Sequence, residues 1–465
     1  MVTLSMQKSS EATLLSMQVT TEDIQRAKDR LRVRNARTSK TPFSRLLLLF
    51  LLIGPGILVM LGENDGPSML SYAATGATYG IGFFIPFIVL TFTMAFVVQE
   101  LTVRLAAVTH RGHAELIFER FGSFWGWFSM IDLAIGNLLT LVVEFIAIQS
   151  GLGYFGVPTP IAVSIGLLLS ITVMLSRRYW TWERIALVLS IFNCLFIPVA
   201  ILVHPHWGQV GQALITWSPL PGKINQNLLL FIISDIGATV TPWMLFFQQS
   251  ALKDKGLTPK DIPHARIDTA LGAFLAAAFG VAAIVATSVL FTHHVDASNF
   301  SSGAFAAAQF AQALEPYAGH IGATLFALAI LEAGLLATIT ISSSTAYAFG
   351  EVTGAAHSLN RSVKEAKGFY AVMIACAAFA AAIVIIPHAP LTLIVLVVNV
   401  IATLAMPPAL IFLILLVNDR KLMGDYVNGR IANIFAIGVT VFLVLAGSIW
   451  GIMTILTGLG ILPNS

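Results

Sequence analysis

The chain has 465 residues, of which 57% are hydrophobic and only 11% are charged, with a mean hydropathy of +0.84. Soluble domains carry about 25% charged residues, so this composition excludes a soluble globular enzyme. It predicts an all-α integral membrane protein, because helices satisfy their own backbone hydrogen bonds in lipid. The sequence contains no nucleotide-binding loop, HExxH or GxSxG motif, so an ATP-driven pump or a hydrolase has no support. We expect no enzyme activity, no cofactor and no nucleic-acid partner.

The first segment, residues 1–43, is polar and basic and lacks the apolar core of a secretory signal. We expect it to form a cytoplasmic tail, with some helix over the stretch TTEDIQRAKDRLRVR. Its basic residues are typical of a segment that helps to orient a membrane protein.

Apolar runs long enough to cross a bilayer as helices, about 20 residues each, fill the rest of the chain. They predict eleven transmembrane helices in one domain at 44–459. The first five form one repeat at 44–203, the next five form a second repeat at 226–417, and 432–459 is an additional helix. Because five is odd, the two repeats have opposite orientations. The predicted spans are 44–78, 82–106, 123–150, 158–175, 185–203, 226–250, 268–291, 319–348, 368–387, 390–417 and 432–459.

The basic residues favour one orientation in the membrane. If the amino terminus is cytoplasmic, 25 of the 26 Lys and Arg residues lie in the tail or in connections on the cytoplasmic side, and only Lys223 lies opposite. Cytoplasmic connections of membrane proteins carry such an excess. We therefore expect a multi-pass protein of the cell membrane, with a cytoplasmic amino terminus and an extracellular or periplasmic carboxyl terminus.

Two of the predicted spans, the first and the sixth, are interrupted by residues that disfavour a helix. The first contains GENDGPS at 62–68, and the sixth contains SDIGATVTPW at 234–243. Pro removes a backbone donor, and Gly lowers helix preference. These spans open the two halves of opposite orientation, and discontinuous helices in such paired positions are typical of secondary transporters that bind substrate between them.

The residues at the two interruptions predict a cation site. Unwound carbonyl groups cannot face lipid without a partner, and a carboxylate such as Asp65 is costly at bilayer depth. Asp65, the hydroxyl of Ser68, the carbonyl groups of Gly237 and Ala238 and the side chain of Thr241 together supply oxygen ligands, which hard divalent cations prefer. Glu63, beside Asp65, is a further acid at this point. The alternative for either interruption alone is a Pro kink whose carbonyl groups bond to neighbouring Ser and Thr.

Other polar residues at membrane depth are less specific. Glu144 in the third span and Asn399 in the tenth are positioned to face the same cavity. We expect Asp132, Asp235 and Glu332 to pair with polar neighbours instead. Glu100 and Arg104 have the i,i+4 spacing of a helical ion pair.

The motif HRGHAE at 110–115 resembles a metal site. Its histidines stand next to Arg111 on the cytoplasmic side, however, and this favours a structural role. His204, His206, His293 and His294 fall in outer connections.

Several stretches resemble the Nramp family of divalent-metal transporters. GPGILVMLGENDGPS (54–68) aligns with that family's first-span pattern, which ends in DPGN, and GATVTPWMLFFQQSA (237–251) is similar to its sixth-span pattern GATVMPH. LLTLVVEFIAI (138–148), LFALAILEAGLLATIT (325–340) and VNDRKLMGDYVN (417–428) are similar to later segments. The resemblance spans about 44–459. It implies a LeuT-like fold with five-plus-five inverted repeats and alternating access to one central metal site.

The sequence departs from the family at the positions that would hold the metal. Asp65 and Ala238 match the family, whereas Ser68 stands in place of its Asn and Asn399 falls at a Gln position. Thr241 replaces the family's Met, and Trp243 replaces its His. In the third span Glu144 matches a family acid, but Leu141 stands at its Asp.

These departures predict selectivity and coupling. A Met thioether favours soft metals, so Thr241 in its place leaves an oxygen environment and room for water, which suits Mg²⁺. The sequence resembles the Nramp-related magnesium transporters in this respect. Family members commonly use the aspartate, the histidine and third-span acids to move a proton; Trp243 cannot titrate and Leu141 cannot relay. We therefore predict uptake of Mg²⁺, and also of Mn²⁺, without proton coupling.

Three alternatives remain open. One is a proton-coupled Mn²⁺ or Fe²⁺ importer of the ordinary Nramp type, and another is a sodium-coupled symporter for an organic solute. A third is a receptor that keeps the fold without transport. The expected partners are a divalent metal ion as substrate and the lipid bilayer, with a monomer as the expected form.

Overall fold

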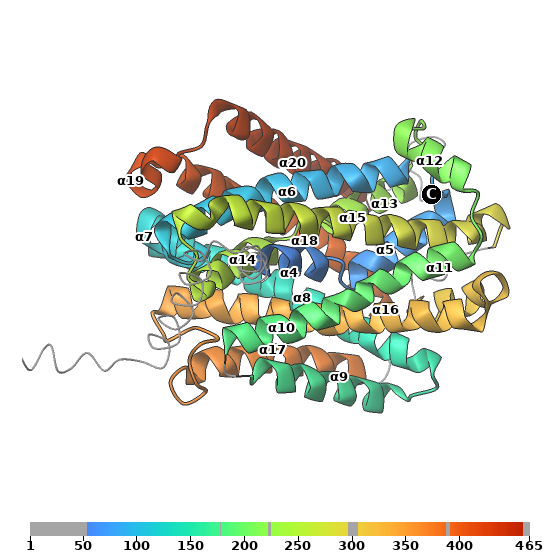
Figure 1. Ribbon diagram of the computed structural model, residues 1–465, viewed down its shortest axis with the longest axis horizontal. Helices are drawn as coiled ribbons and strands as arrows, with labels where there is room; N and C mark the ends of the chain where they lie inside the picture. The colour runs from blue at the N-terminus through green and yellow to red at the C-terminus, as the bar shows by residue number, and fades with distance from the viewer. Residues whose placement is uncertain (1–53, 177, 222–224, 296–305, 387–390, 459–465) are drawn as a thin grey trace, which may run out of the picture.

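The computed structural model describes residues 54–176, 178–221, 225–295, 306–386 and 391–458. The predicted tail at 1–43 and the beginning of the first predicted span lie outside these residues. Every regular element in the described ranges is a helix, and Figure 1 shows most of the long helices running roughly side by side along the long axis of the molecule. The prediction of an all-α fold is therefore confirmed.

The helices follow one another through short connections. In the first half of the chain they are α4 (Pro55–Gly62), α5 (Gly66–Tyr79), α6 (Phe84–Thr109), α7 (His113–Phe121), α8 (Ser123–Tyr154), α9 (Thr159–Met174), α10 (Tyr179–Ser190), the 3₁₀ helix η1 (Ile191–Leu195), α11 (Phe196–Leu202) and α12 (Trp207–Ile215). In the second half they are α13 (Gln226–Gly237), α14 (Pro242–Lys255), η2 (Pro259–Asp261), α15 (Ile262–Thr292), α16 (Ala306–Thr353), α17 (Lys367–Ile385), α18 (Leu391–Val417), α19 (Arg420–Met423), η3 (Gly424–Tyr426) and α20 (Arg430–Gly458). Helix α16 is broken at Gly319, whose φ of 69° is left-handed.

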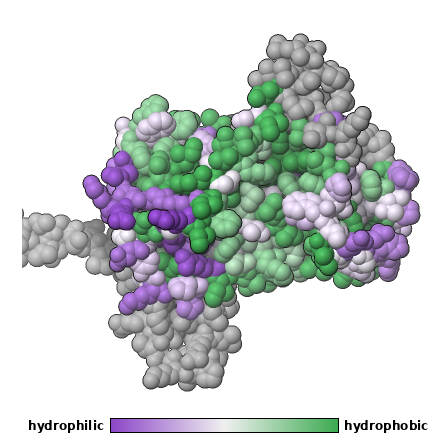
Figure 2. Space-filling model, turned by 90° about the horizontal axis from the view of Figure 1, so that it is seen from above, coloured by the Kyte–Doolittle hydropathy of each residue, from purple (hydrophilic) through white to green (hydrophobic). Residues whose placement is uncertain are grey.

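The described ranges contain eight helical segments that are long and apolar enough to cross a membrane, together with two shorter apolar helices at Thr159–Met174 and Ala405–Val417. Figure 2 shows the corresponding surface, with hydrophobic residues across the middle and hydrophilic residues gathered toward both ends. We call the end that carries α7 and α19 the basic end, because Arg111, Arg120 and Arg420 lie there. The predicted number of eleven crossings stays a prediction.

The centre of the bundle is formed by α8 and α16, which pack along each other, and by α15, which packs against α4, α5 and α6. Glycines permit the close approach of α8 and α16. A Cβ at Gly151 would lie 2.9 Å from the Ala327 carbonyl oxygen, and a Cβ at Gly334 would lie 2.8 Å from the Glu144 carbonyl oxygen. Small residues at helix interfaces are the usual device by which membrane helices pack without a hydrophobic driving force.

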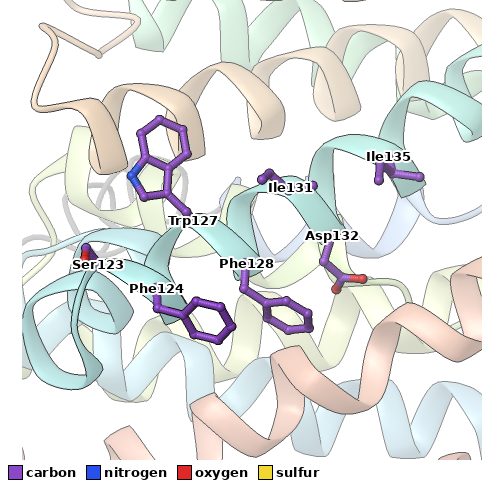
Figure 3. Close-up of a pocket in the computed structure, with 7 residues that line it drawn as sticks. All are labelled: Ser123, Phe124, Trp127, Phe128, Ile131, Asp132 and Ile135. Atoms are coloured by element: carbon purple, nitrogen blue, oxygen red, sulfur yellow. The ribbon is translucent and has the colours of Figure 1, made fainter.

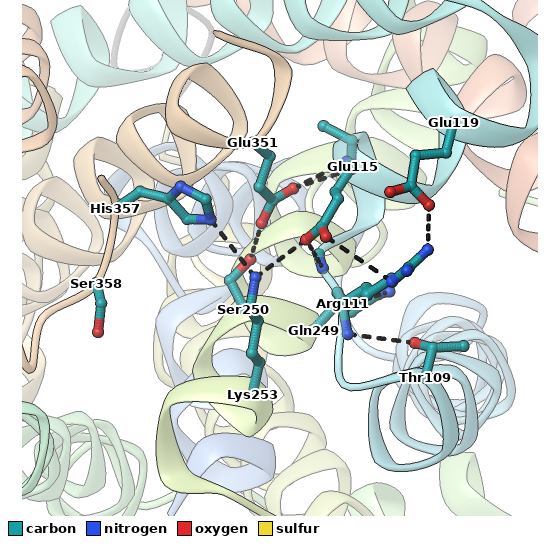
Figure 4. A network of polar contacts seen from close by, with 12 residues as sticks. Thr109, Arg111, Glu115, Glu119, Gln249, Ser250, Lys253, Glu351, His357 and Ser358 are labelled. Carbon is teal, nitrogen blue, oxygen red and sulfur yellow. Dashed lines mark hydrogen bonds and ion pairs between the residues drawn. The ribbon is translucent and has the colours of Figure 1, made fainter. Parts of the chain in front are cut away.

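A polar network joins α7, α14 and the end of α16 at the basic end, as Figure 4 shows. Glu351 accepts hydrogen bonds from the backbone N–H of Ala114 at 3.0 Å and from Ser250 Oγ at 2.6 Å. Lys253 forms an ion pair with Glu115 at 3.0 Å. Burial raises the pKa of Glu115, but the Lys253 ammonium and its hydrogen bond more than offset this and hold the pKa below its ordinary value. The carboxylate of Glu115 is therefore charged at physiological pH.

We expect Glu351→Ala to destabilise this end of the bundle. The substitution removes the acceptor for the first turn of α7, whose N-cap residue Gly112 has no side chain to replace it. Unpaired buried donors cost about 1–3 kcal/mol each, so thermal unfolding in detergent should shift downward clearly. The matched variant is Glu119→Ala on the same network, where the side chain is 48% exposed, and its effect should stay within about 0.5 kcal/mol. Equal melting temperatures for the two variants would contradict the assigned role.

The beginning of α8 carries a groove of about 700 Å³ on the outside of the bundle. Figure 3 shows Phe124, Phe128 and Asp132 along it, with Trp127 on the other side of the helix. Aromatic side chains of this kind are enriched where membrane helices meet the water interface. Asp132 was predicted to pair with a polar neighbour, but the contacts of the described residues give it no hydrogen bond or ion pair, and it lies in this groove instead.

Candidate metal site

The first interruption lies between α4, which ends at Gly62, and α5, which begins at Gly66. Asp65 is the N-cap of α5, and its Oδ1 accepts a hydrogen bond from the backbone N–H of Ser68 at 2.9 Å. Pro67 falls in the first turn of α5, where a missing N–H costs nothing. The sequence therefore ends one helix and starts the next at the point where it places its acidic residues.

Helix α4 is held at its own N-terminus by Asp268 of α15. The Asp268 carboxylate accepts hydrogen bonds from the backbone N–H groups of Gly54 at 3.0 Å, Gly56 at 2.7 Å and Ile57 at 3.3 Å. A carboxylate satisfies the free donors of a helix N-terminus and interacts favourably with its dipole. A buried ion pair, Lys255 with Glu183 at 3.0 Å, lies next to this end. The short α4 is thus anchored by side chains from distant parts of the chain.

The second interruption lies between α13, which ends at Gly237, and α14, which begins at Pro242. Several hydrogen bonds attach it to α5. The hydroxyl of Tyr72 donates to the Ala238 carbonyl oxygen at 2.9 Å, and Ser71 Oγ donates to Asp235 at 2.7 Å. Asp235 also accepts from Thr75 Oγ1 at 3.0 Å, which confirms that it pairs with polar neighbours.

The two interruptions meet through Glu63 and Thr241. Thr241 Oγ1 donates a hydrogen bond to Glu63 Oε2 at 2.7 Å, although the residues are 178 positions apart. The Trp243 indole lies close to the same carboxyl group, but its Nε1 makes no hydrogen bond of good geometry among the described residues. The ring packs against α4, because a Cβ at Gly62 would lie 3.1 Å from it.

Glu144 of α8 completes the acidic cluster. Its Oε2 accepts a hydrogen bond from the Gly66 backbone N–H at 3.0 Å, and its carboxyl group lies close to that of Asp65. Gly66 is required for this approach, since a Cβ there would collide with the Cβ of Ala147. The third span therefore packs its acid directly against the first interruption.

We define the acidic cluster as Glu63, Asp65 and Glu144, which are all buried. Among the described residues no Lys, Arg or His contacts them, and buried oxygen atoms of Glu63, Asn64 and Glu144 have no hydrogen-bond partner. Uncompensated carboxylates at membrane depth are costly, so the cluster requires protons or a bound cation. No three acidic, His or Cys side chains in the described ranges are arranged as a ready metal centre. Any metal here would use one or two carboxylates, with other oxygen atoms or water.

The predicted site residues are distributed as follows. Asp65, Ser68 and Thr241 lie at the interruptions, next to the predicted accessory residues Glu63, Glu144 and Trp243. Gly237 ends α13, and the Ala238 carbonyl already accepts a bond from Tyr72. Asn399 belongs to α18, and its side chain lies outside the described part of the chain. The prediction missed three residues that carry the geometry, which are Asn64, Tyr72 and Asp268.

The histidine motifs have other roles. His113 of HRGHAE is fully buried, and its Nδ1 lies 3.0 Å from Gln249 Oε1. Burial lowers its pKa to about 4, so the imidazole is neutral at physiological pH. These contacts agree with the structural role predicted for the motif. Three histidines of outer connections, His204, His206 and His293, line a cavity of about 310 Å³ at the end opposite the basic end.

Solved structures with a similar architecture define the fold of the chain. The manganese transporter of Eremococcus coleocola, in complex with an aromatic bis-isothiourea compound, superposes with a TM-score of 0.71 at 18% identity, covering 92% of this chain and 91% of that one. A Na⁺-coupled sialic acid symporter superposes with a TM-score of 0.54 at 13% identity, covering 85% and 88%. These likenesses show the LeuT-like fold, which confirms the predicted fold class.

Sequence relatives extend over the same region. The divalent metal cation transporter MntH of Ralstonia nicotianae is 27% identical over 90% of this chain and 93% of its own length. The protein of the same name from Aeromonas hydrophila is 25% identical over 85% and 95%. The family model described as "Natural resistance-associated macrophage protein-like", Nramp, matches residues 56–454. The chain therefore belongs to the Nramp family of divalent-metal transporters, and it is a multi-pass membrane transporter rather than an enzyme.

Proposed function

We propose that this transporter takes up divalent cations by alternating access, with Mg²⁺ as the main substrate and Mn²⁺ as a second one. The observation that carries the proposal is the acidic cluster at the meeting point of the two interruptions, where the hydroxyl of Thr241 bonds to Glu63. The family pattern has Met at position 241, so the soft ligand is replaced by a hard oxygen. A site with few converging carboxylates suits Mg²⁺, which commonly retains several waters.

We also propose that no proton accompanies the metal. Trp243 stands at the family's His position and cannot titrate, and its buried indole packs near Glu63. Uptake is then driven by the metal gradient and by the membrane potential, which contributes about 4.6 kcal/mol per divalent ion for every 100 mV. In this proposal the basic end faces the cytoplasm, in agreement with the distribution of Lys and Arg. Residues 44–203 and 226–417 then form the two inverted repeats.

A second candidate is a proton-coupled Mn²⁺ importer. Its similarity to a manganese transporter and to divalent metal cation transporters favours it. The geometry also favours it, because the carboxyl groups of Asp65 and Glu144 lie close together, and one proton between them would relieve their repulsion. Release of that proton on metal binding would couple the two movements.

Transport into proteoliposomes distinguishes the candidates. We expect Mg²⁺ influx, reported by a luminal Mg²⁺-sensitive dye, that Mn²⁺ inhibits and that an inside-negative potential accelerates. The signal of a luminal pH dye should stay constant during metal uptake. Protein-free liposomes supply the baseline. Strong Mn²⁺ uptake without Mg²⁺ flux would reject the magnesium proposal. Metal-dependent luminal acidification would reject uncoupled transport independently of selectivity.

A further inference from the structure

A second polar site lies away from the acidic cluster, where the helical path through α10 and α11 tightens into the 3₁₀ helix η1. Asn193 of η1 is fully buried and faces Glu332 of α16, which is 4% exposed. Asn193 Nδ2 donates a hydrogen bond to Glu332 Oε2 at 2.8 Å. Gly334, two residues further along α16, packs against the carbonyl of Glu144. Residues two apart on a helix point in nearly opposite directions, so Glu332 lies on the side of α16 that faces away from the acidic cluster.

Each of the two side chains keeps one oxygen without a partner. Glu332 Oε1 and Asn193 Oδ1 are both buried, and neither has a hydrogen bond among the described residues. Leaving a buried polar atom unpaired is costly, and leaving a carboxylate charged without a counter-ion inside a membrane protein is costlier still. The buried carboxyl group therefore requires a proton or a cation, and the amide oxygen requires a donor.

A single proton satisfies both atoms. When a carboxyl group and a carboxamide already share one N–H···O bond, protonation of the other carboxyl oxygen allows an O–H···O bond back to the amide oxygen. We propose that Glu332 and Asn193 form a proton-binding site, in which Glu332 carries a proton on Oε1 and donates it to Asn193 Oδ1. Phe196 of α11, three residues after Asn193, packs edge to face against Phe326 of α16, with ring centroids 5.6 Å apart.

No other described ionisable group takes over this role. The elements packed against α16 include α8, α9, α10, η1, α11 and α17, and α17 carries Lys367, Tyr370 and Cys376. Helix α9 and helix α11 carry no titratable residue, and Cys194 is the one on η1. On α8, Glu144 is engaged by Gly66, Tyr154 contacts His320, and Asp132 lies in the outer groove. On α10, Glu183 forms an ion pair with Lys255 and accepts a hydrogen bond from the Tyr179 hydroxyl. The remaining charged group on α10 is Arg184.

The proposed proton adds a second hydrogen bond between η1 and α16. While Glu332 is protonated, two hydrogen bonds join the elements. As the pH rises and the proton leaves, one bond is lost and Glu332 becomes a buried carboxylate, so the contact between η1 and α16 weakens. Gln at position 332 reproduces the protonated form, because its amide can donate to Asn193 Oδ1 and accept from Nδ2 at any pH. This inference does not depend on which metal is transported.

The test combines a spectroscopic and a functional measurement on the full-length reconstituted transporter. In infrared spectra at neutral pH, the wild type should show a protonated carboxyl C=O band that Glu332→Gln lacks. In metal-uptake assays, the wild type should lose activity at alkaline pH by about tenfold, whereas Glu332→Gln should change by less than about twofold. Glu315→Gln is the matched control, since Glu315 lies on the same helix with its side chain 46% exposed, and it should behave as the wild type does.

A second variant probes the same proton if Glu332→Gln fails to fold. Asn193→Leu removes the amide and should shift the carboxyl band of Glu332 to higher frequency, because the proton loses its acceptor. An unchanged carboxyl band in Glu332→Gln would overturn the proposal, as would an unchanged pH profile. If Na⁺ concentration rather than pH controls the difference between wild type and Glu332→Gln, the site holds an alkali cation and the proton assignment is wrong.

Discussion

Uptake of Mg²⁺ and Mn²⁺ should fall by about 100-fold or more in the variant Asp65→Asn. The amide keeps an oxygen that can accept the hydrogen bond from the Ser68 backbone N–H, so α5 retains its N-cap. What the variant loses is the negative charge at the first interruption. In the proposed site the carboxylates of the acidic cluster supply the negative charge at this depth, so a bound divalent ion would lose a large part of its electrostatic stabilisation.

The measurement is initial metal uptake into proteoliposomes at matched protein density, together with calorimetric titration of the purified variant with Mn²⁺. The control is Asp132→Asn, which removes a carboxylate from α8 in the outer groove rather than at the interruptions. That variant should transport at the wild-type rate. If Asp65→Asn transports within twofold of the wild type, Asp65 is not a ligand of the transported ion.

The residues at the interruptions were predictable because their signals are local. Gly66 and Pro67 disfavour a continuous helix, and Asp65 stands directly before them. Gly237 and Pro242 interrupt the sixth span in the same way and indicated that Thr241 contributes to the same site, and the structure joins Thr241 to Glu63 by a hydrogen bond. Local rules of this kind locate the breaks between helices to within a few residues.

The contacts that hold the site in shape were not predictable in the same way. Asp268 caps α4 from a position 214 residues away from Gly54, and nothing in the local sequence around Asp268 indicates that partner. The bond between Tyr72 and the Ala238 carbonyl spans 166 positions. Such pairs depend on how α15 and α5 pack in three dimensions, so a single sequence supplies the donors and acceptors but not their pairing.

The second large effect concerns selectivity and is expected from Thr241→Met. The substitution restores the thioether of the family pattern GATVMPH and removes the hydrogen bond to Glu63. Thioether sulfur binds Mn²⁺ and Fe²⁺ better than it binds Mg²⁺. We expect Mg²⁺ uptake to fall and the ratio of Mn²⁺ to Mg²⁺ uptake to rise by about tenfold, which corresponds to about 1.4 kcal/mol of differential binding.

Two further substitutions separate the sulfur from the loss of the hydroxyl. Thr241→Ser keeps an oxygen that can still donate to Glu63 Oε2 and should leave the Mn²⁺ to Mg²⁺ ratio unchanged. Thr241→Val removes the hydroxyl without adding sulfur, so it should lower uptake of both ions without favouring Mn²⁺. If Met and Val give the same ratio in competitive uptake assays, the side chain at position 241 does not contact the metal. Hard-ion selectivity would then have to arise from the carboxyl groups of Glu63, Asp65 and Glu144, because these supply the remaining buried acceptors at the meeting of the two interruptions.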